Sequence, residues 1–312
     1  MTVWGASAAL LSTIIGGGIV GIPYAMYLSG IPVGLIINVI CFALSYLSTY
    51  LFMETKKKSD VPIKTLYEFG YVTIGKSSIY YIAFLSIVQT VGFVMIYFIV
   101  FGDLLGSIVL DVFYADNPAD EHKFFASRIC WDIILGLALL PWILKKHLYE
   151  MKLGADIHFA AVAFFIISLF IQRFTKKREY NIDAPGPYNY WEFKFGFKEI
   201  TSFSILLCAY NFSFIEFPLY HSLGPDRTPK KLLDATFVAL SETIVIYVST
   251  GLLVIYLFGS GVDPNCLVNI ANEGGNVLSY LNRIFFAIVI ACHVPYVFFY
   301  GKEGICIVID EI

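Results

Sequence analysis

The stretch LLSTIIGGGIVGIPYAMYLSG, residues 10–30, is the most informative part of the sequence for the fold. It lies in an apolar run long enough to cross a membrane, yet it contains residues that disfavour a continuous helix: Gly16, Gly17, Gly18, Gly21 and Pro23. Within a helix, a glycine costs about 1 kcal/mol relative to alanine and a proline about 3 kcal/mol. We therefore predict that the chain unwinds near residues 16–18. Pro23 then suits the first turn of a second half-helix, where its missing N–H is no loss.

An alternative interpretation is that these small residues only allow a neighbouring helix to approach, which is a common role of glycine in membrane proteins. Unwound backbone at membrane depth persists only where protein or a water-filled cavity covers it. There the freed N–H and C=O groups, together with the half-helix dipoles, can hold a carboxylate or a cation. The first interpretation therefore predicts a binding site, whereas the second predicts only packing.

The composition indicates an integral membrane protein. The 312 residues are 58% hydrophobic and 14% charged, with a mean hydropathy of +0.74, which is far from a typical soluble domain. A spanning helix needs about 20 mostly apolar residues. Eight stretches approach or exceed that length: 3–28, 32–53, 78–104, 129–144, 154–170, 200–222, 232–258 and 278–299. We expect one all-α transmembrane domain over residues 1–312.

The placement of charge suggests an orientation. With a cytoplasmic N-terminus, the lysines at 56–58 and 145–146 fall inside, as the positive-inside rule requires, and the acidic segment 111–123 falls outside. The basic residues of the loop 173–193 would lie outside, which is against that rule. The cysteines show no metal-ligand spacing, and neither a nucleophile–base motif nor a phosphate-binding lysine motif occurs. We expect neither an enzyme, a metal site, a cofactor nor a nucleic-acid partner.

A second interrupted span is predicted in LLCAYNFSFIEFPLYHSLG, residues 206–224. Asn211, Ser213 and Glu216 interrupt its aromatic and apolar run ahead of Pro218. Five spans precede this break, which is the arrangement expected of two oppositely oriented five-helix repeats. The first repeat would cover residues 1–172, and a partial second repeat would cover 199–312.

These segments resemble the amino acid/auxin permease family. The first helix of that family carries G-x-G-I-x-x-x-P-Y-A followed by a glycine pair, and the matching residues here are Gly16, Gly18, Ile19, Pro23, Tyr24, Ala25, Gly30 and Gly34. The segment FPLY at 217–220 is similar to the family's sixth helix. LLVIYLFGSGVDPNCLVNI at 252–270 is similar to the end of its seventh helix, and ACHVPYVFFYGKE at 291–303 to the proline-containing end of its eighth.

The resemblance implies a LeuT-type 5+5 inverted-repeat fold and amino acid transport by alternating access, driven by a proton or sodium gradient. It implies that the substrate binds at Ile15, Gly16, Gly17, Gly18, Ile19, Gln89, Tyr210, Asn211, Ser213 and Phe214. The residues expected to couple transport to H⁺ or Na⁺ are Ser12, Glu216 and His293. Ser12 and His293 depart from the residues that sodium-coupled members carry, which favours proton coupling or uniport.

The resemblance also raises an alternative role for the chain. The family has about eleven helices, whereas eight are expected here. Either the fold is truncated to about eight transmembrane helices, or the sequence is incomplete. A degenerate homologue that serves as a structural membrane subunit, with other subunits supplying the missing helices, is the competing hypothesis. The expected partners are an amino acid and membrane lipids. The plasma membrane, the vacuole or lysosome, and the mitochondrial inner membrane are all compatible with the sequence.

Overall fold

The computed structural model describes residues 2–114, 123–143, 152–175, 191, 196–225, 227–271 and 277–311, and within them regular structure is entirely helical. The elements are α1 (Val3–Ile14), η1 (Gly17–Gly21), α2 (Ile22–Ser29), α3 (Ile31–Lys58), α4 (Leu66–Ile74), α5 (Ser77–Phe113), η2 (Lys123–Ala126), α6 (Arg128–Ile143), α7 (Lys152–Thr175), α8 (Phe197–Ala209), η4 (Ser213–Ile215), α9 (Glu216–Ser222), α10 (Pro229–Phe258), η5 (Gly259–Gly261), α11 (Cys266–Ala271) and α12 (Val277–Glu311). All eight predicted stretches coincide with helices.

Five of the described helical segments are long and apolar enough to cross a membrane, and the bent pair α1–α2 makes a sixth. Helix α6 has 16 residues, and the apolar part of α7 covers residues 157–172, so both are shorter than these spans. An all-helical, multi-pass membrane protein is therefore confirmed. The orientation stays a prediction, because residues 145–151 and 176–190 lie outside the described part of the chain.

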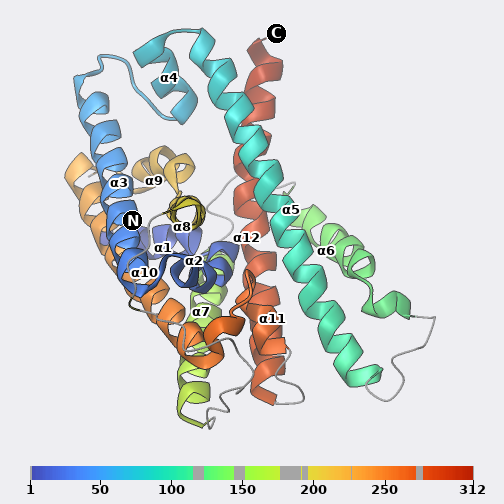
Figure 1. Cartoon of the computed structure of the whole chain (residues 1–312). Helices are drawn as coiled ribbons and strands as arrows, with labels where there is room; N and C mark the ends of the chain where they lie inside the picture. Colours follow the sequence, from blue (N-terminus) through green and yellow to red (C-terminus); the bar gives the residue numbers. More distant parts are fainter. Residues whose placement is uncertain are drawn as a thin grey trace.

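The interrupted helices lie in the middle of the bundle (Figure 1). Helices α3 and α10 flank them on one side, and α5 and α12 flank them on the other. Helix α12 packs along α5 and α7, α10 packs against α1 and α3, and α2 packs against α8. Helix α4 and the C-terminus lie at one end of the bundle, and α11 lies towards the other end.

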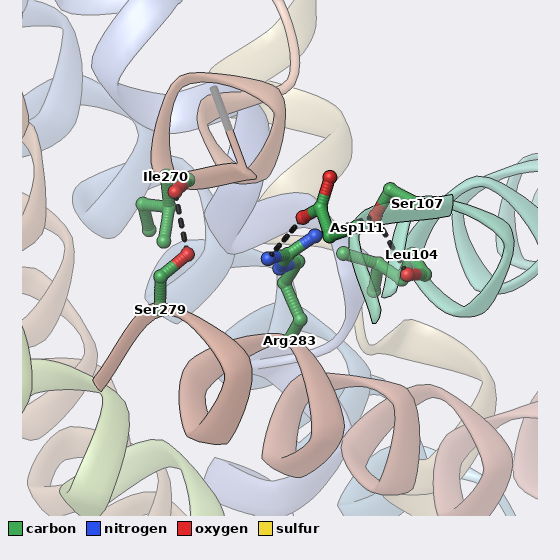
Figure 2. A network of polar contacts seen from close by, with 6 residues as sticks. All are labelled: Leu104, Ser107, Asp111, Ile270, Ser279 and Arg283. Carbon is green, nitrogen blue, oxygen red and sulfur yellow. Dashed lines mark hydrogen bonds and ion pairs between the residues drawn. The ribbon is translucent and has the colours of Figure 1, made fainter. Parts of the chain in front are cut away.

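A buried ion pair joins α12 to α5 and is drawn in Figure 2. Arg283 is fully buried, and its Nη2 lies 2.8 Å from Oδ2 of Asp111. Its Nη1 donates to the Ser107 hydroxyl at 3.0 Å, and the Tyr280 ring lies 4.8 Å from its Cζ. On the next turn, Ser279 donates to the carbonyl of Ile270 at 2.6 Å, which ties α11 to α12.

Two boundaries differ from the sequence-based prediction. The second span was expected to end at residue 53, but α3 continues to Lys58. Helix α4 then follows, and it is started by a capping box in which Thr65 and Glu68 satisfy each other's backbone N–H groups. The eighth span was expected to cover residues 278–299, but α12 continues through Pro295 and past this limit to Glu311. Packing along α5 and α7 offsets the cost of the interior proline.

Candidate substrate site

The first span is broken where the glycines predict it. Helix α1 ends at Ile14, and the backbone leaves helical geometry at Ile15 (φ −80°, ψ 76°) and Gly16 (φ −102°, ψ −148°). Helix α2 then starts at Ile22 with Pro23 in its first turn. The two halves of the span are bent by 53° at the break. Both the predicted unwinding and the predicted role of the proline are confirmed.

The glycines are needed because side chains of other helices press directly on this backbone. A Cβ on Gly16 would lie 2.6 Å from Nε2 of His293 and 2.8 Å from the Tyr97 hydroxyl. A Cβ on Gly17 would lie 2.5 Å from Cε1 of Tyr97, and one on Gly18 would lie 3.1 Å from the Ala209 side chain. The alternative interpretation is therefore also correct in part, since the same glycines both release the backbone and allow close packing.

The second span is interrupted at the position predicted from Asn211 and Ser213. Helix α8 ends at Ala209, η4 follows at Ser213–Ile215, and α9 begins at Glu216. The Asn211 side chain accepts a hydrogen bond from the backbone N–H of Ser213 at 3.3 Å and so holds the start of η4. This break bends the helix less than the first break does. Residues Phe197–Ser222 still form one apolar span, whereas α1 and α2 form a bent pair.

Side chains from distant helices satisfy the backbone groups that the breaks release. The Tyr247 hydroxyl lies 3.0 Å from the carbonyl oxygen of Ile14 and 3.0 Å from that of Ala209. Ser45 donates to the carbonyl of Tyr210 at 3.3 Å. At the first break, hydrogen bonds link His158, Tyr97 and His293 to the backbone of Ile15, Gly17 and Ser12, respectively. Buried backbone polar groups need such partners, so the breaks are supported features of the fold.

A cavity of about 500 Å³ lies between the two breaks, and we call it the central cavity. Its walls come from the first break, α5, α8, α12 and the turn before α11. Most of its surface is apolar. Its polar lining residues are Thr13, Tyr97, Ser204, Cys208, Asn211, Asp263, Asn265 and His293. A mostly apolar pocket with a few polar groups is typical of a small-molecule site.

A second cavity, of about 430 Å³, lies beside the second break. It is lined by Leu44, Ser45, Ser48, Ser204, Leu207, Cys208, Tyr210, Asn211, Phe212, Ser213 and Glu216. Ser204, Cys208 and Asn211 line both cavities, so the two adjoin along one face of α8 and the start of the break. We refer to it as the second cavity.

The predicted substrate residues divide between these cavities. Gly17, Gly18 and Phe214 line the central cavity, Tyr210 and Ser213 line the second, and Asn211 lines both. Gly16 and Ile19 lie in the broken segment, with Ile19 fully buried, whereas Ile15 lines a smaller cavity of about 110 Å³ beside His158. Their roles as substrate contacts stay predictions.

Gln89 lies apart from the residues just described. It is half-buried on α5 and lines none of the three cavities. The residues of α5 that line the central cavity are Phe93, Ile96, Tyr97 and Val100. Gln89 lies one helical turn before Phe93, the first of these residues, and its contact with substrate stays a prediction.

The three predicted coupling residues line three different cavities, although a hydrogen bond links His293 to the backbone of Ser12. His293 lines the central cavity, with its ring edge-on to Tyr97 at 5.3 Å between centroids. Glu216 is 1% exposed and lies in the second cavity, where its Oε1 accepts a hydrogen bond from Thr49 at 3.1 Å. Ser12 lines the smallest cavity, and its hydroxyl donates to the carbonyl of Ala9 at 3.0 Å.

Sequence reasoning missed three residues that shape the site. His158 is one of them: it is 3% exposed, and its ring centroid lies 5.6 Å from that of His293. A lone ionisable residue in an apolar helix was an available signal for His158. Tyr97 and Tyr247 gave no such signal, since tyrosines are frequent in this sequence.

A membrane bundle with two interrupted helices around a central cavity is an arrangement typical of membrane transporters. The family model for "Transmembrane amino acid transporter protein" matches residues 1–300, and the chain belongs to this family. This family is one of transporters, not of enzymes.

The chain is similar to several curated relatives. It is 25% identical over 296 residues to Amino acid transporter AVT6C of Arabidopsis thaliana, covering 88% of this chain and 63% of that protein. It is 24% identical over 319 residues to AVT6E of the same plant, covering 97% of this chain and 62% of that protein. It is 25% identical over 271 residues to Vacuolar amino acid transporter 7 of Saccharomyces cerevisiae, covering 84% of this chain and 51% of that protein. The chain thus spans less than two thirds of the length of these relatives.

Proposed function

We propose that the protein carries amino acids across a membrane by alternating access and that the central cavity is the substrate site. The observation that carries this proposal is the position of the cavity, which is bounded by both broken helices. Interrupted helices that face each other across a polar site are the usual construction of secondary transporters. In this proposal one membrane domain comprises a first repeat at 1–172 and a second repeat that begins at 199, in a LeuT-type arrangement.

The polarity of the first break suits an amino acid. The C-terminal end of α1 at Ile14 presents partial negative charge, and the N-terminal end of α2 at Ile22 presents partial positive charge. An α-amino group therefore prefers the side of α1, and an α-carboxylate prefers the side of α2. The aromatic side chains of Phe93, Tyr97 and Phe214 would enclose the substrate's aliphatic part.

A proton gradient is our preferred driving force. His293 lines the central cavity, and an imidazole can bind and release a proton near neutral pH but is a poor sodium ligand. Sodium coupling is the alternative. The vacuolar name of the yeast relative favours a vacuolar or lysosomal membrane over the plasma membrane or mitochondrial inner membrane. The role of a structural subunit is not favoured, because the relatives found are named as transporters.

Uptake of radiolabelled amino acids into proteoliposomes tests the proposal. We expect accumulation of at least one amino acid when the proton concentration is higher on the side from which uptake occurs, and little accumulation without a gradient. Empty liposomes and liposomes with a sodium gradient provide the controls. No uptake of any amino acid by folded, reconstituted protein, with or without either gradient, would overturn the proposal.

A further inference from the structure

The second cavity adjoins the central cavity and differs from it in chemistry. The two share Ser204, Cys208 and Asn211 as a common wall. A group bound beside Asn211 therefore lies next to both cavities. Both adjoin the second break, which leaves residues 210–212 outside regular α-helix.

The second cavity is lined by the carboxylate of Glu216, and only one of its two oxygens accepts a hydrogen bond. Oε1 of Glu216 accepts the hydrogen bond from Thr49, but Oε2 is buried and accepts no hydrogen bond from any described residue. Removing a carboxylate oxygen from water without a partner is costly. A bound group with positive charge and N–H donors would supply the missing interaction.

The other polar groups of the second cavity also suit a cationic ligand. Ser45, Ser48 and Ser213 contribute hydroxyl oxygens, which can accept hydrogen bonds from an ammonium or guanidinium group. The described residues that line this cavity include one carboxylate and no lysine, arginine or histidine. A volume of about 430 Å³ is also far larger than a single dehydrated metal ion requires, whereas it accommodates a side chain.

We propose that the second cavity binds the positively charged end of the substrate's side chain, with Glu216 as its counter-ion, so that the protein prefers basic amino acids. This inference rests on the proposed function, since the α-amino and α-carboxylate groups must occupy the central cavity at the same time. It gives Glu216 a role in substrate selection instead of the coupling role predicted from the sequence.

The ratio of lysine uptake to alanine uptake in proteoliposomes tests this assignment. We expect the ratio to exceed one in the unmodified protein and to fall about tenfold or more in Glu216→Gln, because the amide keeps the shape and removes the charge. Glu242→Gln is the matched control. Glu242 is a partly buried carboxylate of α10 that lines neither cavity, so its substitution should leave the ratio unchanged.

A second variant keeps the test decisive if Glu216→Gln does not fold. Ser48→Lys introduces an ammonium group into the second cavity, where it would pair with Glu216 and compete with a basic substrate. The lysine-to-alanine ratio should again fall, and added arginine should no longer inhibit uptake of labelled lysine as it does in the unmodified protein.

The possible failures are distinguishable. Uptake of neutral amino acids with no preference for lysine or arginine would overturn the assignment of the second cavity and leave the proposed function intact. An unchanged lysine-to-alanine ratio in folded Glu216→Gln would also overturn it. Absence of uptake for every amino acid would instead count against the proposed function itself.

Discussion

The hydroxyl oxygen of Tyr247 lies 3.0 Å from the carbonyl oxygen of Ile14, the last residue of α1. The same hydroxyl lies 3.0 Å from the carbonyl oxygen of Ala209, the last residue of α8. One side chain of α10 therefore contacts the released carbonyl at the end of each half-helix. Since a hydroxyl has one proton, it can donate fully to only one of the two carbonyls at a time.

Tyr247→Phe tests this link between the breaks. The substitution preserves the ring but leaves two buried carbonyls without their shared donor, which we expect to lower the free energy of unfolding by about 1–3 kcal/mol. Uptake should fall as well, because the relative position of the two breaks is no longer fixed. Thermal unfolding in detergent measures the first effect. Tyr46→Phe, whose ring packs edge-on to Phe237 at 5.9 Å, is the control and should leave both properties unchanged.

The close approach of Tyr97 to Gly17 gives a second prediction. A methyl group at Gly17 would meet Cε1 of Tyr97 at 2.5 Å, so Gly17→Ala must displace a buried ring that lines the central cavity. We expect loss of uptake while the protein still inserts and purifies as a folded monodisperse species. Gly21→Ala is the matched control in the same segment, because its nearest contact, Cγ2 of Ile205, is at an ordinary 3.5 Å. Full activity of Gly17→Ala would argue against a substrate site at the first break.

The ion pair between Arg283 and Asp111 predicts an asymmetric response to substitution. Asp111→Asn leaves a fully buried guanidinium without its counter-ion, which we expect to lower the free energy of unfolding by about 3 kcal/mol. This value is at the low end for breaking a buried pair, because the Asp111 side chain is 35% exposed. Arg283→Met should cost less, since no buried charge is left unpaired. Chemical denaturation in detergent would rank the two variants.

An exposed ion pair whose aspartate also lies on α5 is the control for that ranking. Asp103 of α5 pairs with Arg128 at 2.7 Å, and both side chains are more than a third exposed. Asp103→Asn should therefore cost only about 0.2–1 kcal/mol. Equal destabilisation by Asp103→Asn and Asp111→Asn would contradict the importance assigned here to burial of Arg283.

The backbone features of the site were predictable from the sequence, whereas its side-chain contacts were not. Glycine and proline act through local conformation, so the cluster at 16–23 indicated both where α1 ends and where α2 begins. Tyr247, by contrast, meets Ile14 across 233 positions of the chain. No local pattern encodes such a contact, because it depends on how α10 packs against α1.

The remaining differences have the same physical origin. Gln89 was predicted to contact substrate, and which residues of a 37-residue helix line the cavity depends on packing. His158 stood out as a lone histidine in an apolar helix, but its ring contact with His293 depends on how α7 packs against α12. Helix α4 was missed although its Thr65–Glu68 capping box is a recognisable local signal.

The neighbouring rings of His293 and His158 lead to a prediction about coupling. Their centroids are 5.6 Å apart, and two imidazolium charges at this distance repel each other, so at most one of the two rings is expected to be charged at a time. If His293 carries the coupled proton, His293→Gln should reduce gradient-driven accumulation to the level seen without a gradient, while exchange of labelled for unlabelled substrate continues. His221→Gln is the control, because His221 lies at the end of α9, with its Nε2 3.2 Å from the carbonyl of Ile63. Accumulation by His293→Gln at the level of the unmodified protein would remove His293 from the coupling mechanism, and loss of exchange as well would assign it to substrate binding instead.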